Sequence, residues 1–356
     1  MLRFLSADSV LDCRAKASGD TLPRAPPMDP ERLSSSPDNW HRLILDTIPA
    51  SELRENEPMA RHTTLRVGGP ARFFWPVRDV ESLAVALPKL WAENIPYLLV
   101  GHGSNLLMAD AGFQGLVIQN RCKTVRVGPL TYSDCGVSFG SLFLQTAREG
   151  YGGLEWAIGI PGTVGGALVS NAGAYRGNIG PLVRRVRAFH DGIVENYGAE
   201  WMGFEYRDSR LRRENPPRTV VLDVDLALTP GSDPDEILMR AKKYQTERRD
   251  KQPLYPSAGS FFKNVNDKAL ALSLPDLPLP LKEAGVVPAG FLNMQAGCKG
   301  WREGGAGVAD KHANFLVNLG NATASDFRRL ADRVKAQVED RFGVTLEEEV
   351  LSVGDW

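Results

Sequence analysis

The sequence predicts an α+β protein with more than one domain. Its 356 residues exceed the roughly 100–200 that one domain usually holds. Hydrophobic residues make up 43% and charged residues 24%, so the chain has enough apolar material to bury a sizeable core. Strand-like runs and amphipathic helical segments follow one another without a repeat of fixed period. Together these observations predict a mixed globular fold of two or three domains.

The first part of the chain reads as strands and helices around two glycine-rich loops. Residues 72–76 predict a strand, and Asp79 is placed to cap a helix that runs to Glu93 with apolar residues at helical spacing. Pro88 lies inside that pattern, so a kink or an early helix end is an alternative. Further strands are predicted at 97–100, 116–119, 124–128, 131–138, 182–190 and 219–229, and a helix at 142–149.

The second part begins at a turn cluster over 229–232, which predicts a domain boundary because Pro and Gly interrupt the strand there. A helix is expected over 234–250. The many Leu-Pro steps of 265–290 predict an irregular surface segment. A last amphipathic helix is predicted to start at a capping box formed by Thr323 and Asp326 and to stop at a glycine.

The charge balance argues against one class of partner. Lys and Arg total 42 and Asp and Glu total 43, a formal net charge of −1. No basic excess exists to neutralise a phosphate backbone, so no nucleic-acid partner is expected. A small anionic ligand needs only a few local cations and stays compatible with this balance. The high glycine count of 35 predicts many turns and close backbone approaches.

Cysteine usage and the N-terminus bear on the compartment. No cysteine belongs to a CxxC pair, and histidine is too sparse nearby for a zinc site, so free thiols and no metal are expected. No apolar run approaches the ~18 residues of a membrane span. A cytoplasmic location without a membrane partner is therefore expected. Residues 1–42 are expected to be a disordered arm, or an upstream extension with Met28 as the true start.

The two glycine-rich loops predict a ligand that lies against main chain. The first, GHGSN at 101–105, lacks the third glycine of GxGxxG, so a Rossmann fingerprint is not supported. Its tight turn can still present N–H groups to a pyrophosphate. The second, over 159–175, offers backbone and small side chains; close helix packing is the alternative interpretation. Two such loops in one half of the chain favour a dinucleotide.

Seven motifs occur in a fixed order between about residues 45 and 354. They are HTTLRVGGPA at 62–71, GHGSNLL at 101–107, GIPGTVGGALVSNAGAY at 159–175, YRDS at 206–209, GSFFKN at 259–264, KHANF at 311–315 and LEEEV at 346–350. In this combination the chain resembles the UDP-N-acetylenolpyruvoylglucosamine reductase family. Each motif alone is modest, but the ordered set is specific.

The resemblance implies an FAD-binding domain of the vanillyl-alcohol-oxidase/PCMH type, made of two α+β subdomains, and a C-terminal α+β substrate-binding domain. The expected boundaries are 1–42 for the arm, 43–118 and 119–230 for the subdomains, and 231–356 for the last domain. Non-covalent FAD, NADPH as co-substrate, a nucleotide-sugar substrate and a monomer are expected. The implied FAD contacts are Gly101, Gly103, Ser104, Asn105, Leu106, Ile160, Pro161, Gly162, Thr163, Gly165, Gly166, Asn171, Ala172 and Gly173.

The family's reaction, a step of peptidoglycan precursor synthesis, reduces an enolpyruvyl ether to a lactyl ether. NADPH reduces FAD, and hydride then passes to C3 of the enolpyruvyl group, which leaves an enolate that needs a cation and a proton donor. The resemblance assigns Arg207 as the cation, Ser260 as the proton donor to C2 and Glu349 as the third group. A carboxylate there helps only when protonated or when it orients a donor, which predicts a raised pKa or a positioning role.

Three further residues are implied to bind substrate: Tyr206, Lys251 and Asn264. A solvated helix end is an equally good interpretation of Lys251. Alternatives to the whole assignment are another FAD-linked oxidoreductase of the same superfamily and a non-catalytic nucleotide-binding homologue. No sequence mark separates NADPH from NADH.

Some features leave the mode of substrate closure and the flavin link open. The short spacing from Arg207 to Ser260 resembles the branch of the family that lacks a tyrosine-loop insertion. Substrate closure must then use another element. Segment 265–290 is one candidate, although a passive surface loop is the favoured interpretation. His102 departs from the small residue usual in its loop, and a covalent flavin link through it is given little weight.

Overall fold

The computed structural model of the chain describes residues 37–214 and 219–356, with the backbone alone for residues 37 and 38. Most of the predicted arm lies outside these residues. The prediction that the arm extends to 42 is wrong, because residues 37–42 already belong to helix α1 (Pro37–Leu45). Ile44 is fully buried and Leu43 packs beside it, so burial of apolar residues explains this helix. No helix in the described ranges is long and apolar enough to cross a lipid bilayer.

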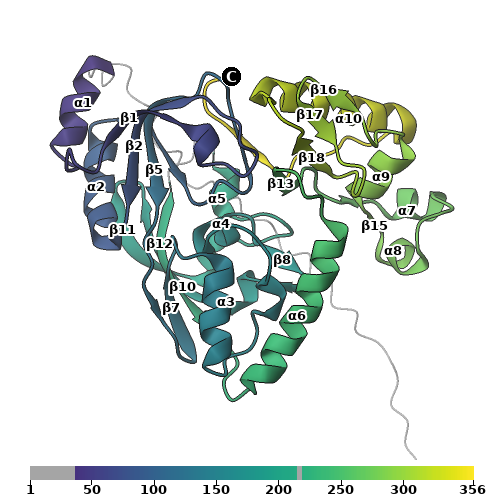
Figure 1. Cartoon of the computed structure of the whole chain (residues 1–356). Helices are drawn as coiled ribbons and strands as arrows, with labels where there is room; N and C mark the ends of the chain where they lie inside the picture. Colours follow the sequence, from purple (N-terminus) through teal and green to yellow (C-terminus); the bar gives the residue numbers. More distant parts are fainter. Residues whose placement is uncertain (1–36, 215–218) are drawn as a thin grey trace, which may run out of the picture.

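The first layered unit is a four-stranded sheet in the order β1-β2-β5-β3, packed against helix α2 (Figure 1). β2, β5 and β3 run parallel, and β1 is antiparallel to β2. The predicted cap is confirmed, since the Asp79 carboxylate accepts from the backbone N–H of Ser82 at 2.7 Å. Pro88 does not end the helix. The bounds are β1 Arg54–Pro58, β2 Pro70–Val77, β3 Tyr97–Val100, β5 Phe113–Asn120 and α2 Val80–Ala92, with a 3₁₀ turn at Met59–Arg61.

The second unit is an antiparallel sheet in the order β11-β10-β12-β7-β6. Strand β11 (Ile193–Gly198) was not predicted, although Asp191 and Gly192 before it both have positive φ, as a two-residue hairpin requires. Helices α3, α4 and α6 pack with this sheet around one core. The bounds are β6 Val125–Arg126, β7 Leu130–Asp134, β10 Val183–His190, β12 Val220–Ala227, α3 Phe139–Arg148, α4 Val164–Val169 and α6 Pro234–Lys251.

Smaller elements complete this unit. The ribbon of β8 and β9 follows α4, and the short helix α5 follows the turn that carries the YRDS motif. Their bounds are β8 Gly173–Ala174, β9 Gly177–Asn178 and α5 Arg210–Arg213, with 3₁₀ turns at Glu155–Ala157, Gly180–Leu182 and Ala199–Met202.

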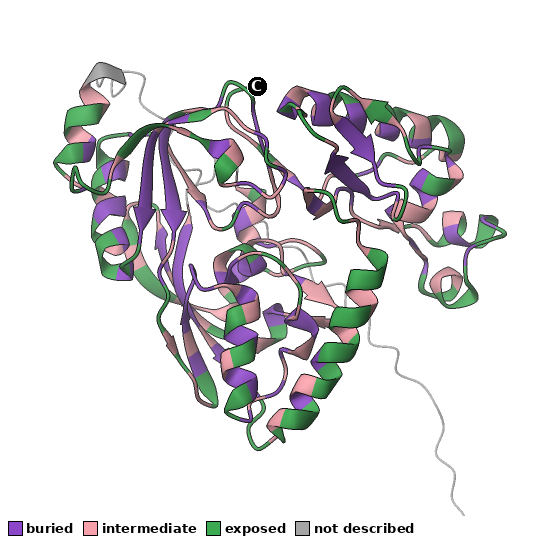
Figure 2. Cartoon of the chain, viewed as in Figure 1, coloured by how far each residue is buried: buried purple, intermediate pink, exposed green. Residues whose placement is uncertain are grey.

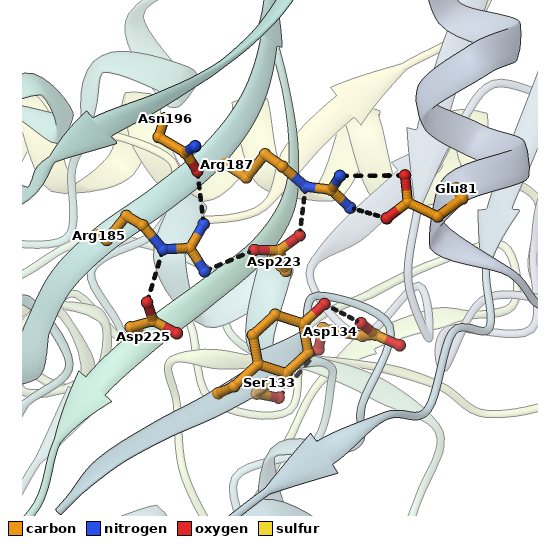
Figure 3. A network of polar contacts seen from close by, with 9 residues as sticks. Glu81, Ser133, Asp134, Arg185, Arg187, Asn196, Asp223 and Asp225 are labelled. Carbon is orange, nitrogen blue, oxygen red and sulfur yellow. Dashed lines mark hydrogen bonds and ion pairs between the residues drawn. The ribbon is translucent and has the colours of Figure 1, made fainter.

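A charge network ties these two units together (Figure 3). Asp223 on β12 is 1% exposed and accepts from Arg185 at 2.9 Å and from Arg187 at 2.6 Å. Arg187 also pairs with Glu81 on α2 at 2.7 Å. Because the buried carboxylate has two guanidinium partners, its charge is compensated. The network therefore clamps α2 of the first unit to the sheet of the second.

The third unit is an antiparallel sheet in the order β13-β18-β17-β16, covered by α9 and α10 (Figures 1 and 2). The capping box predicted at Thr323 and Asp326 is present, and Gly343 ends α10 with φ of 68°. The bounds are β13 Ser257–Ser260, β16 Arg302–Glu303, β17 Ala306–Val308, β18 Phe315–Asn318, α9 Ala289–Gln295 and α10 Ala324–Phe342.

The Leu-Pro segment 265–290 is more regular than predicted. It forms helices α7 (Lys268–Ser273) and α8 (Leu279–Ala284), enclosed by the paired strands β14 (Val265–Asn266) and β15 (Val286–Val287). The Asp267 carboxylate caps α7 by accepting from the backbone N–H of Leu270 at 2.9 Å. Apolar side chains between and within these helices are buried in the core of the third unit, which explains the order of the segment.

The end of the chain returns to the first unit. Strand β19 (Leu351–Val353) pairs in parallel with β4 (Leu106–Met108), which directly follows the first glycine-rich loop. Asp110, just after β4, also accepts from the backbone N–H groups of Ala324 and Ser325 at the start of α10, at 2.8 and 2.9 Å. The third unit is therefore fastened to the first at two places, and the LEEEV motif lies between them.

Candidate active site

A cavity of about 410 Å³ lies where the three units meet. Its volume falls within the usual range for small-molecule and cofactor sites. Both glycine-rich loops line it, together with Arg207, Ser260 and Glu349. Most of the implied FAD contacts face this one cavity. They are Gly101, Gly103, Ser104, Asn105, Leu106, Ile160, Pro161, Gly162, Thr163, Gly165, Gly166, Ala172 and Gly173.

The two glycine-rich loops touch each other, and glycine is required at the contact. A Cβ on Gly101 would lie 2.4 Å from Oγ1 of Thr163 in the other loop. A Cβ on Gly103 would lie 2.1 Å from the backbone oxygen of His62, and Gly103 has φ of +63°. The Ser104 hydroxyl donates to the backbone oxygen of Pro161 at 3.2 Å. The loops thus form one continuous wall of main chain.

This wall presents backbone donors that the protein leaves free. Among the described residues, the N–H groups of His102, Gly103 and Ser104 donate to no protein acceptor, nor do those of Gly162 and Thr163. Successive free N–H groups around a turn form an anion-binding concavity. The arrangement fits FAD, whose pyrophosphate needs such donors and whose ring needs an apolar wall.

The N-terminus of α4 itself is not the anion site. Its first N–H groups are already used: Val164 donates to Val137 at 2.9 Å and Gly165 to Cys135 at 2.9 Å. The third, Gly166, donates to Oγ1 of Thr163 at 3.2 Å. Gly165 is small for a packing reason, since a Cβ would approach Cys135 to 3.1 Å. The loop before the helix, rather than the helix dipole, therefore faces a ligand.

Asn171, an implied FAD contact, does not line the cavity. Its amide donates to the backbone oxygen of Glu205 at 2.7 Å, and its side-chain oxygen accepts from Gly180 at 3.1 Å. Glu205 begins the tight turn that carries Arg207. Asn171 therefore braces the turn of the YRDS motif against the second glycine-rich loop.

Arg207 and Glu349 form an ion pair inside the cavity. Nε of Arg207 lies 3.2 Å from Oε1 of Glu349, with the side chains 25% and 20% exposed. Nε is buried and no N–H is aligned on the carboxylate, so the contact is electrostatic rather than a hydrogen bond. Arg207 has φ of +54°, a left-handed conformation that is unusual for arginine. The guanidinium is thus held in the cavity by a strained turn and stays available to a second anion.

Burial raises the pKa of Glu349, which is the direction predicted from the sequence. Arg207, Arg212 and Lys263 oppose this rise by stabilising the carboxylate. The two other acids of the motif point elsewhere. Glu347 pairs with Lys263 at 2.8 Å, and Glu348 pairs with Arg328 and Lys335 on α10. Of the three acids, Glu349 is the one that lines the cavity.

Ser260 lies at the end of β13, on the strand next to the LEEEV motif. The backbone oxygen of its neighbour Phe261 accepts from Glu349 at 2.8 Å. Asn314 of the KHANF motif clamps the same strand, because its side chain accepts from Phe262 at 3.1 Å and donates to it at 2.9 Å. Sequence reasoning assigned no role to Asn314, although a short polar residue between apolar ones is a typical signal for a buried brace.

The implied substrate-binding residues lie outside the cavity lining. Tyr206 is 51% exposed and lies close to Asn264, so these two come together beside Arg207. Asn264 also accepts from the backbone N–H of Ala289 at 3.2 Å. Lys251, the last residue of α6, is exposed and does not line the cavity.

Arg248 and Gln252 line the cavity from the end of α6, where Lys251 was expected to contribute. Their spacing of four residues places them on one face of the chain, a signal that sequence reasoning did not use. Arg248 lies against Gly159 and over the ring of Tyr175, 5.9 Å from its centroid. Its Nε is buried and has no hydrogen-bond acceptor among the described residues. Burial lowers the pKa of Arg248, and the nearby Arg207 lowers it further.

The remaining titratable groups near the cavity add no further cation. Burial lowers the pKa of His102, so its imidazole is neutral near pH 7. Burial also raises the pKa of the Cys135 thiol well above its usual range. Within residues 37–214 and 219–356, no three His, Cys, Asp or Glu side chains are arranged to hold a metal ion. The charged groups facing the cavity are thus arginines and one carboxyl group.

Comparison with known proteins matches both parts of the chain. A family model described as FAD binding domain matches residues 70–190. The model described as UDP-N-acetylenolpyruvoylglucosamine reductase, C-terminal domain, matches residues 251–353. The predicted class, an FAD-binding domain with a C-terminal α+β domain, is confirmed, and FAD is the cofactor.

Whole-chain relatives agree with these matches. UDP-N-acetylenolpyruvoylglucosamine reductase of Geobacter metallireducens is 40% identical over 309 residues, covering 85% of this chain and 95% of the relative. That of Lachnoclostridium phytofermentans is 36% identical over 309 residues, covering 84% and 92%. The crystal structure of UDP-N-acetylenolpyruvylglucosamine reductase from Thermus caldophilus matches with a TM-score of 0.66 and 34% identity, covering 85% of this chain and 98% of that one. The chain therefore belongs to the UDP-N-acetylenolpyruvoylglucosamine reductase family.

Proposed function

We propose that this chain reduces UDP-N-acetylenolpyruvoylglucosamine to UDP-N-acetylmuramate, with FAD as cofactor and NADPH as co-substrate. The observation that carries the proposal is one cavity lined by both glycine-rich loops and by Arg207, Ser260 and Glu349. The two glycine-rich loops that would hold FAD and the Arg207 guanidinium that would bind a carboxylate thus face the same cavity. Bound FAD, once reduced, supplies the hydride that C3 of the enolpyruvyl group accepts.

Arg207 handles the charge of the substrate. A guanidinium group is planar and can bind a carboxylate in a bidentate manner. When hydride reaches C3, negative charge develops on C2 and the attached carboxylate. Arg207 stabilises this charge more in the transition state than in the substrate, which is what lowers the barrier. Its unaligned contact with Glu349 leaves guanidinium donors for this anion.

Ser260 donates the proton to C2, and Glu349 assists. An unassisted serine is a poor acid, so a nearby cation must stabilise its alkoxide. Arg207 shares the cavity with Ser260 and can supply this charge, whereas Lys263 does not line the cavity and pairs with Glu347. Burial raises the pKa of Glu349, which favours the protonated form that adds no negative charge beside the enolate.

The two alternatives fit these observations less well. Another FAD-linked oxidoreductase of the same superfamily, acting on a different substrate, would not require Arg207, Ser260 and Glu349 in one place. A non-catalytic nucleotide-binding protein would have no need to place an arginine and a buried carboxyl group side by side next to the glycine-rich loops, because burying such groups costs free energy. The geometry therefore favours the reductase.

Anaerobic stopped-flow absorbance tests the proposal. NADPH should bleach the flavin of the purified protein, and the enolpyruvyl nucleotide should restore the oxidised spectrum within single turnovers. UDP-N-acetylglucosamine, which lacks the enolpyruvyl group, is the matched control and should leave the flavin reduced. A flavin that NADPH reduces but the enolpyruvyl nucleotide does not reoxidise would reject this function.

The domain boundaries, oligomeric state and compartment belong to the same proposal. Residues 43–118 and 119–230 would hold FAD and residues 231–356 the nucleotide sugar. Helix α6 lies beyond the boundary proposed at 230, yet its Ile237 and Ala241 pack in the core of the second unit, which favours a boundary after α6. A cytoplasmic location is supported by free, buried thiols at Cys122, Cys135 and Cys298, and a monomer is part of the same proposal.

A further inference from the structure

We propose that Arg212 is a positioning residue, which holds the main chain of the LEEEV motif so that the Glu349 side chain stays beside Arg207. This inference rests on the proposed function, in which Glu349 lies next to the enolate. Arg212 belongs to the short helix α5, directly after the turn that carries Arg207. It was not among the residues that the sequence singled out.

The contacts of Arg212 are specific to two backbone oxygens. Nη1 donates to the carbonyl of Glu349 and Nη2 to the carbonyl of Glu348, both at 2.8 Å. Hydrogen bonds from a charged donor are stronger than those between neutral groups. A planar guanidinium bound to two successive carbonyls fixes both the direction of the LEEEV main chain and its distance from α5.

A second donor from another unit reaches the same carbonyl. The side-chain amide of Asn105, in the first glycine-rich loop, donates to the backbone oxygen of Glu349 at 3.0 Å, and the backbone oxygen of Asn105 accepts from the backbone N–H of Leu351 at 3.0 Å. The peptide group of Glu349 is thus held by Arg212 from the second unit and by Asn105 from the first. The cavity lies where these units meet the third.

Removing the Arg212 guanidinium from water costs free energy, which argues that a charged group serves a function at this position. Burial lowers the pKa of Arg212, and within the described residues the side chain forms no ion pair. Its helix neighbours behave differently: Arg210 lies over the ring of Trp201 and Arg213 pairs with Asp208 at 2.8 Å. Placing a guanidinium out of water is unfavourable unless its donors are satisfied. Two carbonyls at the motif supply that compensation.

The placement couples the two halves of the ion pair. Helix α5 follows the turn of Arg207 directly. One local segment therefore carries Arg207 and also, through Arg212, binds the main chain at Glu348 and Glu349. Four groups bear on the charge of Glu349: Arg207, Arg212 and Lys263 stabilise its carboxylate, and Tyr206 faces it from the same turn. Loss of Arg212 would release the strand and remove one of these cations.

The variant Arg212→Met tests the proposal, with Arg210→Met on the same helix as the matched control. Flavin content of the purified protein reports whether the fold is intact. Reduction of the flavin by NADPH should keep its wild-type rate, since it does not use Glu349. Reoxidation by the enolpyruvyl nucleotide should slow by about 10- to 100-fold, the effect expected when a reacting group is misplaced. Arg210→Met should leave both half-reactions unchanged.

The pH dependence of reoxidation separates positioning from a purely structural role. Removing a cation lets the pKa of Glu349 rise further, so the high-pH limb of the profile should move to higher pH in Arg212→Met. Arg212→Lys keeps the charge but loses the fork. It should restore the position of this limb while recovering only part of the rate. If Arg212→Met does not retain flavin, Arg212→Lys carries the test through its rate and its profile.

Failure of the proposed function and failure of the proposed role of Arg212 give different results. If the wild-type flavin is not reoxidised by the enolpyruvyl nucleotide, the proposed function fails. If the wild type is reoxidised while both Arg212 variants match Arg210→Met in rate and profile, the function stands and the positioning role of Arg212 is rejected. Equal slowing of both half-reactions would reject it as well, because it would indicate a general structural effect.

Discussion

Nε of Arg207 lies 3.2 Å from Oε1 of Glu349, although the two residues belong to different units of the fold. Arg207 enters the cavity from a strained turn, and Glu349 from the strand segment that returns to the first glycine-rich loop. A cation and a buried carboxyl group thus share the space next to Ser260.

Replacement of Ser260 by alanine should separate the two half-reactions. The hydroxyl is the proposed proton donor to C2 and takes no part in flavin reduction. We expect normal bleaching by NADPH and a loss of reoxidation of at least about 100-fold, the usual scale for losing a general acid. Rapid-mixing absorbance measures both steps. Ser273→Ala, on the exposed helix α7, is the control, and normal turnover in Ser260→Ala would remove the serine from the mechanism.

Glu349 should give reoxidation a high-pH limb. Because burial raises its pKa, the protonated form persists to higher pH than for an ordinary glutamate. Activity that needs this form is therefore complete below the raised pKa and lost as pH rises through it. Glu349→Gln, which stays neutral, should flatten this limb and retain part of the rate. A wild-type profile with no such limb, or an unchanged limb in the variant, would contradict the assignment.

Arg248 should bind a phosphate of a nucleotide. Like Arg207, it lines the cavity with a buried Nε that lacks a hydrogen-bond acceptor within the described residues, but unlike Arg207 it forms no ion pair with a described carboxylate. We expect Arg248→Met to weaken binding of FAD, NADP⁺ or UDP by about 10- to 100-fold, the range for one charged hydrogen bond. Flavin content and titrations with NADP⁺ and UDP, followed through the flavin spectrum, identify which nucleotide is affected. Arg240→Met on the same helix is the control, and three unchanged affinities would exclude the role.

Gly101→Ala should weaken FAD binding through the loop contact. The added Cβ would meet Oγ1 of Thr163 at 2.4 Å, so the two glycine-rich loops must separate. Less bound flavin per protein, measured by absorbance after gel filtration, is the expected result. Gly140→Ala is the matched control, because nothing lies within 4 Å of its Cβ and alanine favours the helix α3. Full flavin occupancy in Gly101→Ala would show that the loops tolerate separation.

Asp110 should stabilise the junction of the first and third units. Its carboxylate caps α10 by accepting from the backbone N–H groups of Ala324 and Ser325. Asp110→Ala should lower the free energy of unfolding by about 0.5–2 kcal/mol, the usual effect of losing a helix cap. Urea denaturation measures this change. Asp332→Ala, on an exposed face of the same helix, should change the free energy far less.

Much of the local structure followed from short-range patterns. The cap at Asp79, the capping box at Thr323 and Asp326, and most of the strands formed as predicted, because caps and periodicity act within a few residues. The failure over segment 265–290 had a cause that is partly long-range. Segment 265–290 folds into two short helices because Asp267 caps one and a distant apolar core covers them, and the core is not visible in a window of Leu-Pro steps.

Short motifs were enough to predict the fold class, the two glycine-rich loops and the candidate residues Arg207, Ser260 and Glu349. Each loop and each of these residues lies within a contiguous motif of the chain. Contacts in three dimensions were needed to show that Glu347 and Glu348 pair elsewhere, that Asn171 braces a turn, and that Arg212 and Arg248 stand near or at the site. These choices depend on contacts between segments far apart in the chain. Such contacts arise when strand β19 returns to β4 and the three units close around one space.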